Sequence, residues 1–464
     1  MNAYLYAMQE KSFPPAFEQR MRSQLGDAWN AFANIHSTDS PISIRLNSQK
    51  TGAQPIDLLS TPDMHSKIPW TENGYYLKQR PSFTLDPSFH AGAYYVQEAS
   101  SMLLEQAIKQ CVGNHEVVRT LDLCAAPGGK STHLLSLLSK DSLVVSNEVI
   151  RSRATILAEN IMKWGYSNVV VTNNDPEDFQ RLNGFFDLMV VDAPCSGEGL
   201  FRKDAEAMKE WSVDNANLCS LRQQRILHDI WPALKEDGLI IYSTCTYNPE
   251  ENANNLRKFL EEHDAEIVPL QLDKAWGIEA LSIGYQCFPH QVQGEGFYLA
   301  VLRKKEAQPG ARLRVAKNVF HKPVKLLADY QQWMTPADQT FLQFKDYLLA
   351  LPASLTIEME FLASLLKIVS AGTTLGTVKH TKLIPDHALA LSIYLNKESF
   401  PSIEVDKEEA IAYLRKDVFW KEGLTKGFSS IQYKGFTLGW VNVLDNRLNN
   451  LYPAEWRIRM AANS

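Results

Sequence analysis

The stretch Arg119–Leu135, RTLDLCAAPGGKSTHLL, decides the fold. Residues 120–123 predict a short buried strand, and the residues from Ser131 onward predict the first turns of a helix. Between them, AAPGGK ends the strand, turns through two glycines and starts the helix. This arrangement points free backbone N–H groups at whatever lies above the strand ends, the usual ligand position in an open α/β sheet. The loop matches neither a dinucleotide fingerprint nor a P-loop, so a purely structural turn stays open as an alternative.

Strands and helical patterns alternate after this loop, which predicts a largely parallel sheet covered by helices. The predicted strands are residues 143–147, 167–172, 186–191 and 239–244, and the helical patterns include 151–164 and 217–234. Each strand is followed by acidic or thiol side chains, which are Glu148, Asp175, Asp192 with Cys195, and Cys245. A carboxylate at the tip of the second strand is placed to accept hydrogen bonds from two ribose hydroxyls. The pattern indicates nucleoside recognition combined with cysteine chemistry.

The motifs LDLCAAPGGKS, DAPCSGEG and YSTCTYNPEEN resemble the RNA (cytosine-5) methyltransferases of the Nop/Sun family, in particular their bacterial RsmF (YebU)-like branch. Shorter matches are IRLN at 44–47, YYVQEASSM at 94–102 and FRKD at 201–204, so the resemblance covers roughly residues 40 to 302. It implies an α/β, Rossmann-like class I methyltransferase domain with a seven-stranded sheet whose last strand is antiparallel. It also implies S-adenosyl-L-methionine as the cofactor.

The predicted organisation has four parts. Residues 1–90 form a small N-terminal domain that, by resemblance, positions RNA, and residues 91–302 form the catalytic domain. Residues 303–325 form a basic linker with eight Lys or Arg against one Glu. Residues 326–464 form an α+β RNA-binding region that is PUA-like towards its end, where GFTLGW and LYPAEWR carry the resemblance. A plain stabilising β-domain is the alternative for this last part.

Composition narrows the class of protein further. The six cysteines lack C-x-x-C spacing, which argues against a zinc site and a disulfide framework, and we expect no metal. Free thiols, the lack of an apolar run of membrane length and an N-terminus unlike a signal peptide predict a cytoplasmic protein without membrane contact. We also expect a monomer. The net charge of −6 predicts RNA binding that is modest in affinity and sensitive to salt.

The two motif cysteines suit methylation of cytosine, because carbon 5 becomes nucleophilic only after a thiolate attacks carbon 6. The resemblance assigns the attack to Cys245 and help with release to Cys195, while Asp192 and Lys130 position the base. The cofactor site is predicted to comprise Cys124, Ala125, Ala126, Pro127, Gly128, Gly129, Lys130, Ser131, Glu148, Asp175 and Asp192. Glu148 would hold the ribose and Asp175 the adenine amino group. The predicted RNA contacts are Arg45, Asn47, Arg202 and Lys203, although Arg45 and Asn47 could equally cap local structure.

The resemblance implies small-subunit (16S) ribosomal RNA, or the small ribosomal subunit, as the substrate. The target cytosine must be unpaired or flipped out, since a paired base cannot reach two cysteines. Transfer RNA stays open as a substrate. A catalytically silent RNA-binding or ribosome-assembly factor is disfavoured by the intact motifs. A DNA cytosine methyltransferase is disfavoured because its nucleophile belongs to the Pro-Cys motif and needs no Thr-Cys partner.

Overall fold

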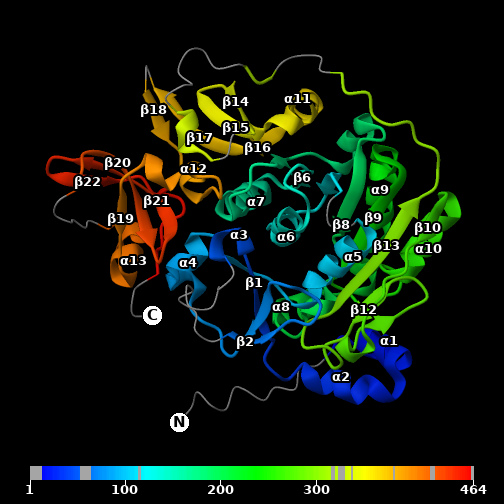
Figure 1. The fold of residues 1–464 in the computed structure, drawn as a ribbon. Helices are drawn as coiled ribbons and strands as arrows, with labels where there is room; N and C mark the ends of the chain where they lie inside the picture. Colours follow the sequence, from blue (N-terminus) through cyan, green and yellow to red (C-terminus); the bar gives the residue numbers. More distant parts are fainter. Residues whose placement is uncertain are drawn as a thin grey trace, which may run out of the picture.

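The structure is a computed structural model that describes residues 13–52, 64–112, 116–314, 319–321, 330–335, 338–379, 382–417 and 424–460. A large central sheet lies in the middle of the molecule, and three smaller sheets surround it (Figure 1). Within the described residues, no helix is long and apolar enough to cross a membrane.

Ten strands form the central sheet, in the order β11-β12-β13-β9-β8-β5-β6-β7-β16, with β10 also paired to β13. Five of them run parallel, namely β5 (Arg119–Asp122), β6 (Leu143–Asn147), β7 (Val169–Thr172), β8 (Phe186–Asp192) and β9 (Leu234–Thr244). The others are antiparallel to their neighbours, namely β10 (Ala265–Ile267), β11 (Glu279–Ala280), β12 (Tyr285–Cys287), β13 (Phe297–Lys304) and β16 (Ile368–Ala371). The predicted Rossmann-like domain and its antiparallel last strand are confirmed. The sheet exceeds seven strands because β10 and β12 pair separately with β13, and because β11 and β16 extend the two edges.

Helices cover both faces of this sheet, so its strands are buried on both sides. One core cluster joins the strands to α9 (Val213–Ile230) and α10 (Ala253–Glu262). The other joins them to α5 (Leu104–Cys111), α6 (Gly129–Leu137) and α7 (Arg151–Trp164). Burial on both sides explains why the strands read as continuous apolar runs in the sequence.

The N-terminal region forms a four-stranded sheet of order β2-β3-β1-β4 beside the catalytic domain. Its elements are α1 (Pro15–Leu25), α2 (Trp29–Ile35), β1 (Ile42–Leu46), α3 (Ser48–Thr51), β2 (Met64–Lys67), β3 (Gly74–Leu77), α4 (Pro87–His90) and β4 (Tyr94–Val96). Phe17 of α1 and Phe32 of α2 pack against Phe201 and Tyr247 of the catalytic domain. Residues 1–12 of the predicted N-terminal domain lie outside the described part.

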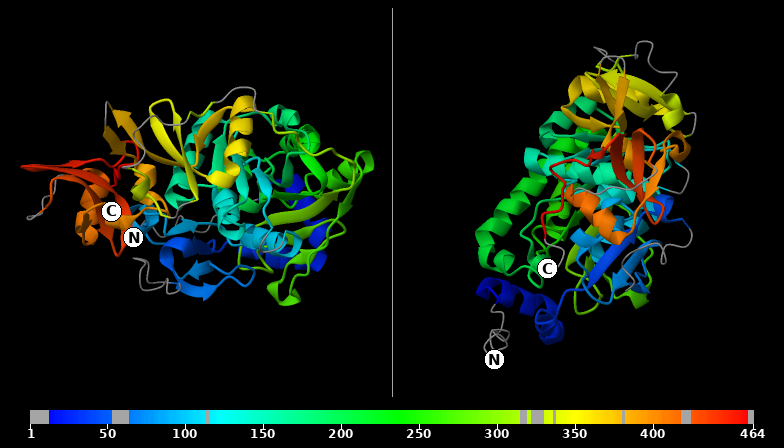
Figure 2. Two further views of the ribbon diagram at one scale, coloured as in Figure 1. Left: turned by 45° about the horizontal axis from the view of Figure 1, so that its top comes forward. Right: turned by 90° about the vertical axis from the view of Figure 1, so that its left-hand side faces the viewer.

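The C-terminal region contains two further sheets (Figure 2). The first comprises β14 (Gln339–Phe344), β15 (Tyr347–Pro352), β17 (Thr373–Lys379) and β18 (Lys382–Pro385), with α11 (Thr356–Leu365) and α12 (His387–Leu391). The second comprises β19 (Ser402–Glu404), β20 (Gly427–Tyr433), β21 (Phe436–Leu444) and β22 (Arg447–Asn450), with α13 (Lys407–Arg415). Strand β16 belongs to this region, yet it pairs with β7 of the catalytic domain. The predicted boundary at residue 325 does not anticipate that pairing.

The basic segment predicted as a linker begins inside the catalytic sheet. Arg303 and Lys304 are the last residues of β13, and Lys304 is fully buried. Its ammonium donates hydrogen bonds to the backbone carbonyls of Trp231 and Leu234. Lys304 is therefore a structural residue, whereas residues 315–318 and 322–325 of the predicted linker lie outside the described part.

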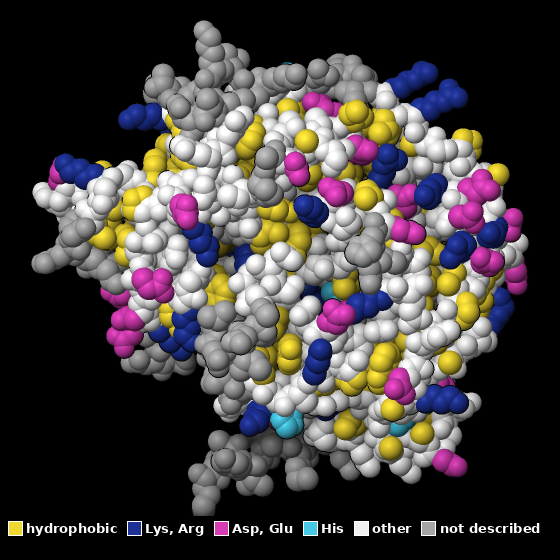
Figure 3. Space-filling view, in the orientation of Figure 1, with side chains coloured by type: hydrophobic (Ala, Val, Ile, Leu, Met, Phe, Trp, Pro, Cys, Tyr) yellow, Lys and Arg dark blue, Asp and Glu magenta, His cyan; other side chains and the backbone are white. Residues whose placement is uncertain are grey.

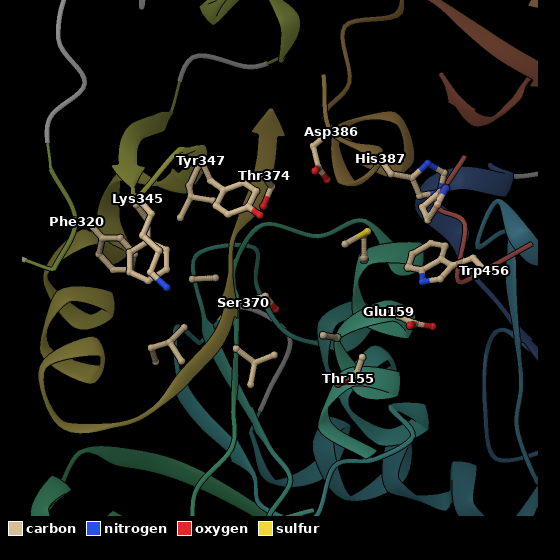
Figure 4. Close-up of a pocket in the computed structure, with 18 residues that line it drawn as sticks. Thr155, Glu159, Phe320, Lys345, Tyr347, Ser370, Thr374, Asp386, His387 and Trp456 are labelled. Atoms are coloured by element: carbon tan, nitrogen blue, oxygen red, sulfur yellow. The ribbon is translucent and has the colours of Figure 1, made fainter. Parts of the chain in front are cut away.

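A largely apolar cavity of about 530 Å³ lies where the catalytic domain meets the C-terminal region (Figure 4). Thr155 and Glu159 of α7 form one side, Tyr347 of β15 lies across from them, and Trp456 comes from the end of the chain. Acidic and basic side chains are interspersed over the face in Figure 3, without a single dominant basic area. The lack of a dominant basic area on this face is consistent with the net charge of −6.

Candidate active site

The glycine loop joins β5 to α6 and is held from below by a buried acid. Gly128 has a φ of 117°, a backbone conformation that side-chain-bearing residues rarely adopt, and it directly precedes α6. Asp122 ends β5, is fully buried, and accepts a 2.6 Å hydrogen bond from the Ser131 hydroxyl. Burial raises the pKa of Asp122 to about 7. Sequence reasoning missed Asp122, although an acid at the end of this strand follows the same pattern as the other strand ends.

The predicted acids stand at the carboxyl ends of the neighbouring strands. Glu148 directly follows β6 and is 2% exposed, with one oxygen accepting from the Ile150 N–H and the other 3.1 Å from the Arg153 guanidinium. Asp175 follows β7 and caps a short helical turn by accepting from the Glu177 N–H. Both carboxylates therefore lie along the edge of the sheet at which the glycine loop opens.

Asp192 and Lys130 form an ion pair in the centre of this edge. The Lys130 ammonium lies 2.7 Å from Asp192 Oδ2 and 5.2 Å from the centroid of the Phe297 ring. The Ser243 hydroxyl donates to the other Asp192 oxygen at 2.8 Å. Burial alone would lower the pKa of Lys130, but Asp192 and, more weakly, Asp122 and Cys245 raise it above its ordinary value. Lys130 therefore carries a positive charge close to Cys245.

The two motif cysteines are brought together, with Cys195 Sγ 3.2 Å from Cys245 Sγ. Cys195 lies in the loop after β8, and Cys245 directly follows β9. The contact with Cys245, together with burial, raises the pKa of Cys195 well above its ordinary value. Burial also raises the pKa of Cys124 strongly, which fits a packing role in the loop.

Glu251 holds the two cysteine loops in register, and sequence reasoning missed this role. Its carboxylate is fully buried and accepts from the Ser196 N–H at 2.8 Å, the Ser196 hydroxyl at 2.5 Å and the Gln223 amide at 3.2 Å. Ser196 follows Cys195, and the Ser196 hydroxyl also lies 3.0 Å from that of Thr246, which follows Cys245. Helix α10 begins at Ala253, and the turn that precedes it directs Glu251 inward.

Three of the predicted RNA contacts are buried and bonded within the protein. Arg45 donates to Gln97 and Thr132, and its guanidinium lies 4.5 Å from the Trp164 ring centroid. Asn47 donates to the carbonyls of Gly92 and Trp164. Arg202 donates to the Thr38 hydroxyl and to backbone carbonyls of the segment before β1. These side chains join the N-terminal region to the catalytic domain, so their prediction as RNA contacts is not supported, whereas Lys203 is exposed.

The residues along this edge fit S-adenosylmethionine. The buried Glu148 carboxylate lies at the tip of β6, and the adjoining Val149 and Ile150 expose 54% and 50% of their surface. Exposed aliphatic side chains beside a carboxylate suit the face of an adenine next to its ribose. The glycine loop and Asp192 supply polar groups for the methionine end. Val149 and Ile150 were not predicted, although apolar residues after a strand-end acid are the signal that could have found them.

A mixed α/β sheet with a glycine loop and strand-end acids of this kind defines a Rossmann-like methyltransferase. Four family models match successive parts of the chain. They are the N-terminal domain of 16S rRNA methyltransferase RsmF (13–99), 16S rRNA methyltransferase RsmB/F (110–303), the first C-terminal domain of RsmF rRNA methyltransferase (327–393) and the methyltransferase RsmF PUA domain (400–458). The predicted PUA-like end of the chain is thereby confirmed.

Among curated relatives, the ribosomal RNA small subunit methyltransferase F of Klebsiella pneumoniae is 30% identical, over 96% of this chain and 96% of its own. The corresponding protein of an Enterobacter species is 29% identical, over 96% of this chain and 95% of its own. The chain belongs to the RsmF family. RsmB/F proteins are S-adenosylmethionine-dependent methyltransferases of cytosine carbon 5 in ribosomal RNA.

Among solved structures, a methyltransferase homolog from Pyrococcus horikoshii superposes with a TM-score of 0.56 at 27% identity. It covers 66% of this chain and 99% of its own. The similarity extends the family assignment to the fold of the catalytic part.

Proposed function

We propose that this protein methylates carbon 5 of a cytosine in small-subunit (16S) ribosomal RNA, with Cys245 as nucleophile and Cys195 assisting release. The observation that carries the proposal is the 3.2 Å separation of the two sulfur atoms, beside the Lys130–Asp192 ion pair. A single nucleophilic cysteine would need no second thiol at this distance. The PUA domain at the end of the chain supports an RNA substrate.

The Lys130 ammonium lies close to Cys245 and would stabilise a thiolate there, which favours Cys245 as the nucleophile. Cys245 would bond to carbon 6 of the cytosine, which makes carbon 5 nucleophilic. Asp192 and Lys130 would orient the ring, and the Asp192 carboxylate would stabilise the proton that the ring nitrogen gains. S-adenosylmethionine supplies the methyl group when it is bound.

Release requires the proton on carbon 5 to leave before the bond to Cys245 breaks. Cys195 lies beside that bond and, as a thiolate, would accept the carbon-5 proton; the bond between carbon 6 and Cys245 then breaks, and Cys245 leaves as the thiolate. Glu251 acts as a positioning residue, because it holds both loops through Ser196 and its contact with Thr246. We further propose that the protein acts as a monomer in the cytoplasm and that residues 91–302 form the catalytic unit.

A trapping experiment tests the thiol assignment. Cys195→Ala should still attack and transfer methyl but stall, giving a protein–RNA band that survives denaturing electrophoresis. Cys245→Ala and the double variant should give no band and lose essentially all turnover. The reverse pattern, with the band lost on changing Cys195 and kept on changing Cys245, would overturn both roles. Bisulfite maps of total RNA with and without the protein identify the target and separate ribosomal from transfer RNA.

A further inference from the structure

A polar cavity of about 470 Å³ lies between the N-terminal region and the catalytic domain. Its lining includes Ser40, Arg80, Gln97, Glu98, Lys203 and Glu295. Arg80 and Lys203 are exposed, so two cations stand at its rim. The cavity therefore offers positive charge outside and acidic groups inside.

The cavity adjoins the active site on several sides. The side chain of Gln97 packs beside the glycine loop: a Cβ atom built on Gly129 would lie 3.7 Å from Cδ of Gln97. Glu295 directly precedes Gly296. A Cβ atom built on Gly199 would lie 2.4 Å from the carbonyl oxygen of Gly296 and 2.8 Å from that of Cys245, so these two backbone segments lie side by side. A nucleotide in this cavity would thus lie close to a cytosine bound at Cys245.

The two acidic side chains of the cavity, Glu98 and Glu295, differ in their hydrogen bonds. Glu98 is used by the fold, since it accepts from the backbone N–H groups of Ser100, Ser101 and Glu295. Glu295 is 3% exposed, and in the described part of the chain neither of its carboxylate oxygens has a well-formed hydrogen bond. The Arg202 guanidinium lies 3.9 Å away. Burial raises the pKa of Glu295 to about 7, while Ser40 and Arg202 lower it.

An unsatisfied buried carboxylate is costly, and a ligand that brings N–H donors would relieve this cost. We propose that the cavity holds an unpaired guanosine close to the target cytosine, with its Watson–Crick edge donating to Glu295 and its phosphate paired with Lys203 and Arg80. This inference rests on the proposed function.

Guanine is favoured because its Watson–Crick edge carries adjacent N1–H and N2–H donors, which match the two oxygens of a carboxylate. Adenine, cytosine and uracil each place acceptors beside their donor on that edge. A carboxylate therefore selects guanine and repels the other bases. Both Glu295 oxygens are shielded in the structure, so binding of the base requires the Glu295 side chain to turn towards the cavity.

Transcripts of the RNA segment around the methylated cytosine test the inference. Each nearby guanosine is replaced in turn by adenosine or by inosine, which lacks the 2-amino group. At one of these positions, replacement of guanosine by adenosine should lower kcat/KM and binding affinity by about tenfold to a hundredfold. Replacement by inosine at the same position should lower both by less. Glu295→Gln should lower activity on the guanosine transcript and remove most of the discrimination at that position.

Glu206→Gln, an exposed acid on α8 (Ala205–Glu210), is the matched control and should discriminate like the wild type. Thermal midpoint and S-adenosylmethionine affinity should be unchanged in both variants. The inference is overturned if every replacement changes kcat/KM and binding affinity of the wild type by less than twofold. It is also overturned if Glu295→Gln discriminates between the transcripts as strongly as the wild type. Formation of 5-methylcytosine without any guanosine preference refutes this subsite alone. Absence of 5-methylcytosine from every transcript refutes the proposed function, and the binding measurements then still decide the subsite.

Discussion

Arg45→Ala should destabilise the protein without weakening its electrostatic attraction for RNA. The guanidinium is 1% exposed and donates at 2.8 Å to Gln97 and at 2.6 Å to the Thr132 hydroxyl. Charged hydrogen bonds of this kind contribute about 1.5 kcal/mol or more each, and the contact with Trp164 adds about 1 kcal/mol. We therefore expect a loss of about 3–5 kcal/mol in the free energy of unfolding.

Urea denaturation measures the stability, and RNA affinity at several salt concentrations measures the phosphate contacts. The slope of log affinity against log salt should be unchanged in Arg45→Ala. Lys203→Ala is the matched control, since this lysine is exposed and the loss of one phosphate contact should reduce the slope by about 1 at wild-type stability. Wild-type stability in Arg45→Ala, combined with a reduced salt slope, would refute the structural role.

Other predictions concern the cofactor, pH and the C-terminal region. Glu148→Ala should weaken S-adenosylmethionine binding by about 1–3 kcal/mol, and unchanged calorimetric affinity would contradict its place on the ribose. Burial raises the pKa of Glu251 to about 7, so its ionisation opposes folding as the pH rises from about 4.5 to 7. Relative to Glu251→Gln, the wild type should lose about 2–3 kcal/mol in the free energy of unfolding across this range, measured by denaturation. Curves of stability against pH that run parallel for the two proteins would exclude the shift. A chain cut near residue 305 should aggregate, because Leu351, Phe361 and Leu362 share a core with Phe185; a monomeric fragment that binds cofactor normally would contradict this.

The catalytic domain could be predicted because its signals are local. Strand, loop and helix follow one another within Arg119–Leu135, and parallel strands bring their carboxyl ends to one edge of the sheet. Cys195 and Cys245 therefore met as expected, although they are fifty residues apart in sequence.

The roles of Arg45 and Glu251 could not be predicted in this way, because their partners are distant in the chain. Arg45 reaches Thr132, and Glu251 reaches Ser196, across contacts that only the folded structure specifies. A buried cation and an exposed one look alike in a sequence. The same reason explains why the sequence predicts Lys304, at the start of a basic segment, as a linker residue.

The pairing of β16 with β7 has a consequence for how the chain is made. Synthesis proceeds from the N-terminus, so β7 is completed long before Ala371 emerges from the ribosome. Until then the catalytic sheet carries an open parallel edge, a surface that invites pairing with other chains. The backbone N–H of Lys367 also bonds to Asn174, next to the predicted adenine contact Asp175. A nascent catalytic domain therefore carries an unpaired β7 edge until β16 has been made and can pair with it.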